Sequence, residues 1–236
     1  MSMGDQDRIC DTKQVIFCSR PCERGAQRQP RWPSFIAVLA AGGLYFALHS
    51  DLVVGPRWLL PAAIVAFLIP TVISHQTGRH HLDRLLGFVV SSLLTIGLIA
   101  SVILLVKALP SHRQSPVALM RSAASLWFTN VLVFALWYWR LDAGGPHDRD
   151  SRRTHEGGSF LFPQMTMSAD ERRAIRQVLW SPRFFDYLFL AFNTSTAFSP
   201  TDTPALTQWA KLLMMVQSII SLTVLALLAA RAVNIL

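Results

Sequence analysis

Charged side chains are scarce in this sequence of 236 residues: Asp, Glu, Lys and Arg together make up 15%, whereas hydrophobic residues make up 52%. Mean hydropathy is positive, at +0.36. Soluble domains carry about 25% charged residues, so this composition is typical of a chain that lies largely in lipid. Once the apolar blocks are set aside, too little sequence remains for a separate catalytic or binding domain of ordinary size.

Cysteine is also rare, and its three copies, Cys10, Cys18 and Cys22, all lie in the N-terminal tail. An odd number with uneven spacing argues against a disulfide framework. A structural metal site would need a fourth ligand and tighter pairing. We interpret these residues as reduced cytoplasmic thiols, with a metal or redox role as the alternative.

Motifs that carry catalysis are missing as well. The sequence has no Gly-rich phosphate loop, no nucleophile elbow and no serine with an obvious base. Imidazole and carboxylate groups gather at His75, His80, His81 and Asp83. Adjacent histidines diverge on a helix, however, and this spacing matches no compact ligand motif. We expect a cationic loop at the membrane surface here, and we expect no enzyme, no metal and no cofactor.

Long apolar stretches, in contrast, are abundant. A helix needs about 20 residues to cross a bilayer core. The stretch Phe184 to Phe198 is shorter and covers only ~22 Å of a core of ~30 Å, so it must borrow flanking residues, thin the bilayer or enter without crossing. The five clearer candidates are Ser34 to His49, Trp58 to Ser74, Leu85 to Leu109, Val117 to Trp139, and Trp209 to Arg231.

This pattern predicts an all-α, polytopic membrane bundle of about six transmembrane helices. The bundle would occupy residues 32–236, with a cytoplasmic loop at 140–183. Residues 1–31 are polar and basic without a sustained apolar period, so we expect them to be disordered. The first apolar stretch follows this tail directly, which predicts an uncleaved anchor rather than a secretory signal.

The distribution of Lys and Arg predicts the orientation of the bundle. Sixteen of them lie in the tail, in the loop before the third stretch and in the loop 140–183, against four in the other connections. Basic loops stay on the cytoplasmic side. We therefore expect a protein of the bacterial inner membrane with a cytoplasmic N-terminus, and a cytoplasmic C-terminus if 184–198 crosses. The net charge of +8 lies in loops rather than on one folded face, so we expect no binding to nucleic acid.

The long loop itself has two parts. "DAGGPHDRDSRRTHEGG", from Asp142 to Gly158, is rich in Gly and charge and indicates a flexible linker. Ser168 and Glu171 then have the spacing of a capping box and predict a helix over "ADERRAIRQVLW". That helix could lie on the membrane surface or be fully solvated, and the sequence leaves both alternatives open.

Polar residues inside the apolar stretches need an explanation, because burying them in lipid costs free energy. They can hydrogen-bond a neighbouring helix, an interaction worth about 0.6 to 2 kcal/mol, or they can line a polar path. Both interpretations remain open at this point. The candidates are Asn130, Asn193, Thr194, Ser195, Thr196, Gln217 and Ser221.

The C-terminal half also resembles a known family. An aromatic-ended segment at 137–139 is followed by Phe162 and Pro163, by Asp186 and Tyr187, by a Thr-rich turn ending near Asp202, and by Asn234. Over residues 126–236 this order is similar to DUF1345, an uncharacterised family of bacterial integral membrane proteins. The resemblance implies a membrane protein and brings no known activity.

A second, fainter resemblance is to the pore loop of potassium channels. Thr194, Thr196, Phe198 and Asp202 occupy similar places, but Ala197 and Ser199 stand where the filter glycines belong. The basic loop before Phe184 also places the start of this stretch on the cytoplasmic side, which favours a crossing segment over a loop that dips from outside.

The leading functional hypothesis is a channel or transporter for an ion or small polar solute. The hydroxyl groups of the short stretch, paired with those of the last one, would coordinate the solute. The alternative is a non-transporting structural or regulatory membrane partner, in which the same groups hold helices together. The lipid bilayer is the expected partner in both cases, and a homo-oligomer is compatible with either.

Overall fold

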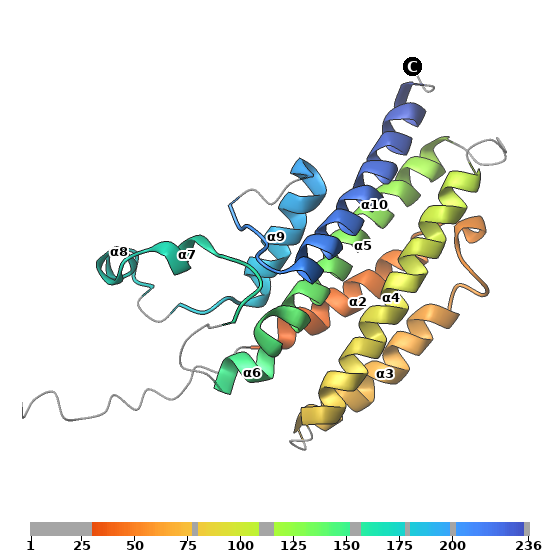
Figure 1. Cartoon of the computed structure of the whole chain (residues 1–236). Helices are drawn as coiled ribbons and strands as arrows, with labels where there is room; N and C mark the ends of the chain where they lie inside the picture. Colours follow the sequence, from red (N-terminus) through yellow and green to blue (C-terminus); the bar gives the residue numbers. More distant parts are fainter. Residues whose placement is uncertain are drawn as a thin grey trace, which may run out of the picture.

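The computed structural model describes residues 30–76, 80–108, 116–151, 157–177, 180–198 and 202–233, and over these ranges the chain is all-α (Figure 1). Two short 3-10 helices, η1 (Ser50–Leu52) and η3 (Asp142–Gly144), accompany the α-helices. The only extended pairing in the described ranges is an isolated antiparallel bridge between Phe160 and Ala205. The α-helices are α2 (Trp32–Phe46), α3 (Leu59–Gln76), α4 (His80–Ala108), α5 (Pro116–Leu141), α6 (Pro146–Ser151), α7 (Pro163–Thr166), α8 (Ala169–Ala174), α9 (Phe184–Ala197) and α10 (Gln208–Val233).

Each apolar stretch of the sequence forms a helix, with ends that differ from the expected ones by a few residues. Three helical regions of the described chain are long and apolar enough to cross a membrane: 82–108, 117–144 and 208–230. Apolar portions of α2 and α3 are shorter. The membrane character predicted from composition is thus supported by three helices.

Helix α5 is the centre of the bundle. It packs against α2, α4, α9 and α10, and α3 packs on the outer side of α4. Its residues Val133, Ala135, Leu136 and Tyr138 have no exposed surface. Small side chains such as Ser122 at other positions of α5 let the neighbouring helices approach closely.

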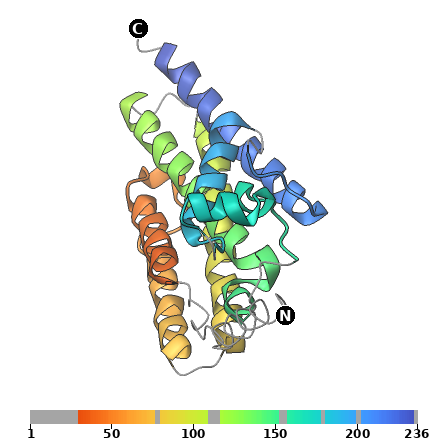
Figure 2. The ribbon, with the colours of Figure 1, turned by 90° about the vertical axis from the view of Figure 1, so that its left-hand side faces the viewer.

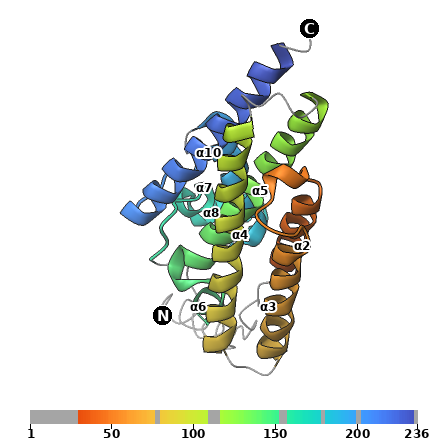
Figure 3. The ribbon, with the colours of Figure 1, turned by 90° about the vertical axis from the view of Figure 1, so that its right-hand side faces the viewer.

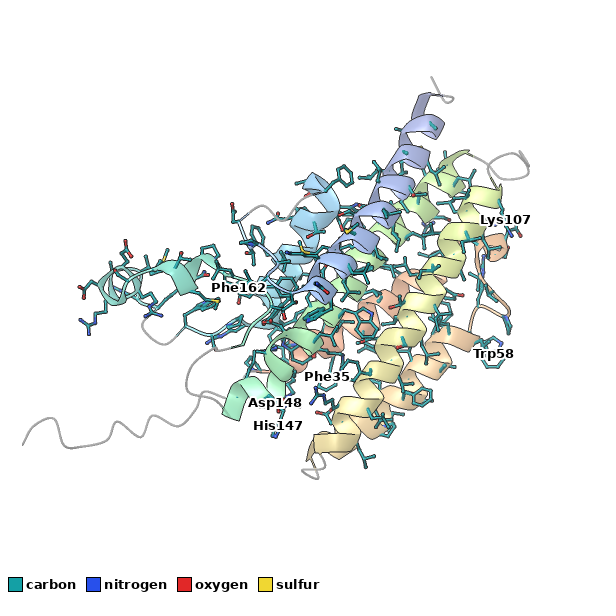
Figure 4. The ribbon with its side chains drawn as sticks, in the orientation of Figure 1. Phe35, Trp58, Lys107, His147, Asp148 and Phe162 are labelled. Atoms are coloured by element: carbon teal, nitrogen blue, oxygen red, sulfur yellow. The ribbon has the colours of Figure 1, made fainter. Side chains whose placement is uncertain are left out.

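Contacts at the two ends of the bundle give the direction of each helix. At one end Arg31, before α2, pairs with Asp83 in α4 at 2.5 Å, and Gly87 of α4 lies against the guanidinium of Arg140. At the other end the amide of His49 donates to Ser122 Oγ at 3.3 Å. Helices α2 and α4 therefore run away from the Arg31 end, and α3 and α5 run toward it. Figure 4 shows Trp58 and Lys107 at one end and His147 and Asp148 at the other.

Helices α9 and α10 run in the same direction. Gln217 Nε2 donates to the carbonyl of Ala191 at 2.7 Å, and Ser221 Oγ donates to the carbonyl of Ser195 at 2.6 Å. Both pairs are 26 residues apart, which is the signature of parallel helices. After α9 the chain returns to the end of the bundle where α9 begins. There the carbonyl of Pro204 accepts a hydrogen bond from the Leu161 amide at 3.1 Å. The chain thus enters α9 and begins α10 at the same end of the bundle.

This arrangement corrects the expected topology. Six alternating crossings would make α9 and α10 antiparallel and would place both termini on one side. Instead, α10 ends on the side of the bundle opposite Arg31. In Figures 2 and 3 the C-terminal end of α10 lies at the top, far from the bottom, where α3 ends and α4 begins. Residues 204–206, in the turn after α9, lie beside residues 159–161. The physical reason is that hydrogen bonds from α10 hold α9 in a parallel register.

The long loop is more ordered than its composition predicts. The expected linker begins with η3 and α6, and both Asp142 and Arg149 are buried there. The capping box is confirmed, since the Ser168 amide donates to Glu171 Oε2 at 2.7 Å and the Glu171 amide to Ser168 Oγ at 3.3 Å. The hydrogen bond that the Glu171 carboxylate accepts from the Ser168 amide, together with the Ser168 side chain, lowers the pKa of Glu171. The helix is shorter than expected, because α8 ends at Ala174 and Arg176 takes a left-handed conformation with φ of 59°.

Several expectations fall outside the described part of the chain. They concern the N-terminal tail with Cys10, Cys18 and Cys22, which lies almost wholly in residues 1–29, and the side chains of His75, His80 and His81. Asp83 is described, and it pairs with Arg31.

The topology can be tested by cysteine accessibility. In a protein without its three natural cysteines, we expect single cysteines at Gly157 and Leu206 to react with an impermeant maleimide from the same side of the membrane. A cysteine at Ala230 should react from the opposite side, because α10 separates it from Leu206. Labelling of Leu206→Cys and Ala230→Cys from one side would contradict the parallel arrangement.

Candidate functional site

Five fully buried polar side chains from α5, α9 and α10 meet in the middle of the bundle: Asn130, Tyr138, Ser195, Gln217 and Ser221. We call them the polar cluster. Gln217 is its centre, because its Oε1 accepts from the Tyr138 hydroxyl at 2.5 Å and its Nε2 donates to Ser195 Oγ at 2.7 Å. The same Nε2 reaches the carbonyl of Ala191. One amide side chain thus connects three helices.

The serines of α10 close the end of α9. The last four carbonyl groups of a helix have no partner within the helix, and a bilayer core offers no water to replace one. Ser221 Oγ donates to the carbonyl of Ser195 at 2.6 Å, and Ser218 Oγ to that of Thr194 at 3.4 Å. Trp127 Nε1 donates to Ser221 Oγ at 2.9 Å and holds this hydroxyl in place. The hydroxyl groups of α10 therefore act as a cap for a helix that ends inside the bundle.

Asn130 joins the cluster from α5, and of its two polar side-chain atoms only Nδ2 is hydrogen-bonded to described residues. Its Nδ2 donates to the carbonyl of Gln217 at 3.2 Å and lies 3.5 Å from Ser195 Oγ. Its Oδ1 is buried and has no hydrogen-bond partner among the described residues. Since a buried acceptor without a partner costs free energy, Oδ1 is the least satisfied point of the cluster.

The seven candidate residues separate into two groups. Asn130, Ser195, Gln217 and Ser221 meet in the polar cluster, and Thr194 is buried beside it, where its hydroxyl donates to the carbonyl of Leu190 at 2.8 Å. Asn193 is half-buried and Thr196 is exposed, on another face of α9. Thr196 Oγ1 donates to the carbonyl of Phe192 at 3.0 Å. The polar path expected along all seven residues is therefore not continuous within one chain.

Two residues of this centre were missed in the sequence. Trp127, which donates to Ser221, and Tyr138 of the polar cluster were not among the candidate residues. Their distance from Asn130, three and eight positions, places all three on one broad face of a helix. That spacing was the signal that could have connected them.

A second buried centre holds the other end of α9. Asp142 has no exposed surface and accepts from the Tyr187 hydroxyl at 2.6 Å and from the Ser159 amide at 2.5 Å. Arg149 Nη1 donates to the carbonyls of Asp142 and Trp139 at 2.7 and 2.9 Å, and its guanidinium lies 5.1 Å from the centre of the Tyr187 ring. This centre joins α5, α6 and α9 to the segment that begins at Ser159.

Phe160 connects this centre with the start of α10. Its ring is fully buried and packs edge-on against Tyr138, Tyr187 and Trp209, at centroid distances of 5.1, 6.4 and 5.9 Å. The backbone on either side of Phe160 pairs with residues 204–206. The loop before α9 and the turn after it are thereby held against each other.

The described residues offer hydrogen bonds and charge, but no metal centre: they contain no group of three or more His, Cys, Asp or Glu that could hold an ion. Both buried centres are occupied by interactions between helices. Their arrangement fixes α9 at its start, through Tyr187, and near its end, through Ser195. The face of α9 that points away from both centres, which carries Asn193 and Thr196, remains accessible from outside the bundle.

We expect Gln217→Leu to lower the free energy of unfolding by about 1 to 3 kcal/mol, because the Tyr138 hydroxyl and the Ala191 carbonyl lose a buried partner. Thermal unfolding of the purified protein in detergent would measure this. Ser218→Ala is the matched control: it removes one long hydrogen bond from the same face of α10 and should cost less than about 0.5 kcal/mol. Equal effects of both substitutions would contradict the central role of Gln217.

Tyr187→Phe removes the hydroxyl that Asp142 accepts and should cost about 1.5 to 3 kcal/mol, the range for hydrogen bonds to charged groups. Tyr45→Phe provides the comparison, because Tyr45 is also buried and its hydroxyl donates to no described residue. The same unfolding assay applies. A smaller loss for Tyr187→Phe than for Tyr45→Phe would show that Asp142 does not anchor α9.

A scan against protein-family models, a search of curated proteins and a search of solved structures found no match to this chain.

Proposed function

We propose that this protein lies in the inner membrane of a bacterium, with its N-terminus in the cytoplasm, and moves an ion or small polar solute across it. We also propose that residues 126–236 belong to the DUF1345 family, on the motifs described above. The observation that carries the transport proposal is the parallel arrangement of α9 and α10. It makes α9 a half-helix that enters the bundle and does not cross it.

The depth of α9 supports this role. Ser195 is level with Ser221, so α9 ends opposite the middle of α10, which continues for eleven residues from Thr223 to Val233. Figure 1 shows α10 extending beyond α9. In membrane transport proteins, interrupted helices of this kind end at substrate and ion sites near the midplane of the bilayer.

The sign of the charge favours a cation. The C-terminal end of a helix carries a partial negative charge, and here it faces the interior of the membrane region. Phe198 ends α9 in a left-handed conformation, with φ of 54°, so the chain turns away from the helix at this point. Carbonyl groups at such an end can replace part of the hydration shell of a cation.

The path proposed here follows the outward face of α9, not the polar cluster. Asn193 and Thr196 are accessible there, whereas the polar cluster is closed by its own hydrogen bonds. Polar groups and irregular backbone at membrane depth require water or protein around them. We therefore propose that copies of the chain surround a shared aqueous path, with the last turn of α9, which carries Asn193 and Thr196, turned toward it.

A non-transporting structural or regulatory partner is the second candidate. It is favoured by one observation: four of the seven candidate residues are engaged in hydrogen bonds between helices. In that case the polar cluster only holds the bundle together, and the accessible face of α9 binds another membrane protein.

Cation flux into liposomes that contain the purified protein distinguishes the two candidates. We expect Asn193→Leu and Thr196→Val to reduce potassium or sodium flux about tenfold, which corresponds to about 1.4 kcal/mol in the barrier. Both side chains are accessible, so the fold should tolerate the change.

The matched control is Thr223→Val in α10. Thr223 is also exposed and its hydroxyl also donates to a carbonyl of its own helix, that of Ile219, at 2.8 Å. This variant should keep the flux of the natural protein. Absence of flux in the natural protein, or equal flux in all variants, would reject transport along α9 and favour the structural role.

A further inference from the structure

An apolar groove of about 790 Å³ opens on the side of the bundle between α2 and α9, with α5 as its floor. Both walls pack on α5 but touch each other only weakly. The groove does not include the polar cluster, and on α9 it ends at Phe192, before Asn193 and Thr196 of the proposed path. Its volume lies within the range of about 300 to 1,000 Å³ that is typical of ligand pockets.

The lining of the groove fits hydrocarbon and nothing polar. None of its lining residues carries a polar side chain. The wall formed by α9 presents Phe185, Phe189 and Phe192, and Phe128 of α5 adds a fourth ring. The wall formed by α2 presents Gly43, where an added Cβ would meet no atom within 4 Å. A polar ligand would lose its hydrogen bonds with water here and gain none.

The ring-lined wall of the groove suits a flexible hydrocarbon chain. A helix with side chains is about 10 Å across. A single hydrocarbon chain is narrower and can follow a groove bounded by rings. In a bilayer such chains are supplied at high concentration by lipids.

The charge at one end of the groove indicates the headgroup. Phe185 forms the end of the groove nearest the start of α9, and the exposed Arg183 precedes it by two residues. Helix α2 begins at the same end of the bundle, where Arg31 is already paired with Asp83. The N-terminus of α9 and the exposed Arg183 favour a negative group.

We propose that the groove between α2 and α9 binds one acyl chain of an anionic phospholipid, whose phosphate lies near Arg183. The rings of α9 hold the chain, and the small residues of α2 leave it room. The bound lipid fills the space between two walls that otherwise touch only weakly.

The protein purified in detergent and incubated with dioleoyl phosphatidylglycerol provides the test. After detergent washes, native mass spectrometry should find a retained lipid on the natural protein. Gly43→Leu should reduce retention about tenfold, the factor expected if about two methylene groups lose their burial. Arg183→Gln should reduce retention of phosphatidylglycerol more than that of dioleoyl phosphatidylcholine, in which the choline cation offsets the charge of the phosphate.

Ala66→Leu is the matched control, because Ala66 is an exposed small residue of α3 outside the groove. It should retain lipid as the natural protein does, and size-exclusion chromatography should find all variants folded. Equal retention by Gly43→Leu and Ala66→Leu would overturn the proposal. A change in oligomeric state of Gly43→Leu without loss of lipid would assign the groove to a helix of a second copy instead.

Discussion

The structure depends on how one helix ends inside the bundle. On the side of α9 that faces α10, the residues of its last two turns are buried, and side chains of α10 supply hydrogen bonds to carbonyl groups there. Gln217 and Ser221 of α10 do so, at 2.7 and 2.6 Å. Because both donors come from one face of α10 and meet carbonyls at the same spacing, they also fix the two helices in parallel. The direction of α10, and with it the position of the C-terminal end of the bundle, follows from this constraint.

The opposite end of α9 is held by a different kind of interaction. Tyr187 donates to the buried Asp142, and Arg149 packs over the ring of Tyr187 while it bonds to the backbone at Asp142. Phe160 extends this centre to the start of α10. A half-helix held at both ends is a rigid element, and rigid elements position binding groups more accurately than loops do. This rigidity is why the accessible face of α9, with Asn193 and Thr196, is the most reasonable place for a transport site.

The helices could be predicted from the sequence because their signal is local. Runs of apolar residues indicated α2, α3, α4, α5, α9 and α10 with errors of a few residues, and the spacing of Ser168 and Glu171 indicated a capping box that is present. Asn130 and Gln217 could be singled out because a polar side chain in an apolar run requires a partner. Asp142 and Arg149 could not, since neighbouring glycines and charges are typical of a linker and their burial depends on Tyr187, far along the chain.

The sequence by itself determined the class of the protein and the extent of its helices, because hydrophobicity acts on each segment separately. Only the tertiary structure decided what the polar residues do and which way α9 points. Counting basic residues assumes that every apolar helix crosses the membrane, and the length of α9 did not settle whether it does. The direction of α9 relative to α10 was set by hydrogen bonds between residues 26 positions apart, and by the pairing of Phe160 with Ala205. Such contacts between distant parts of the chain leave no periodic pattern in the sequence, so the return of the chain after α9 could be recognised only once the helices were placed together.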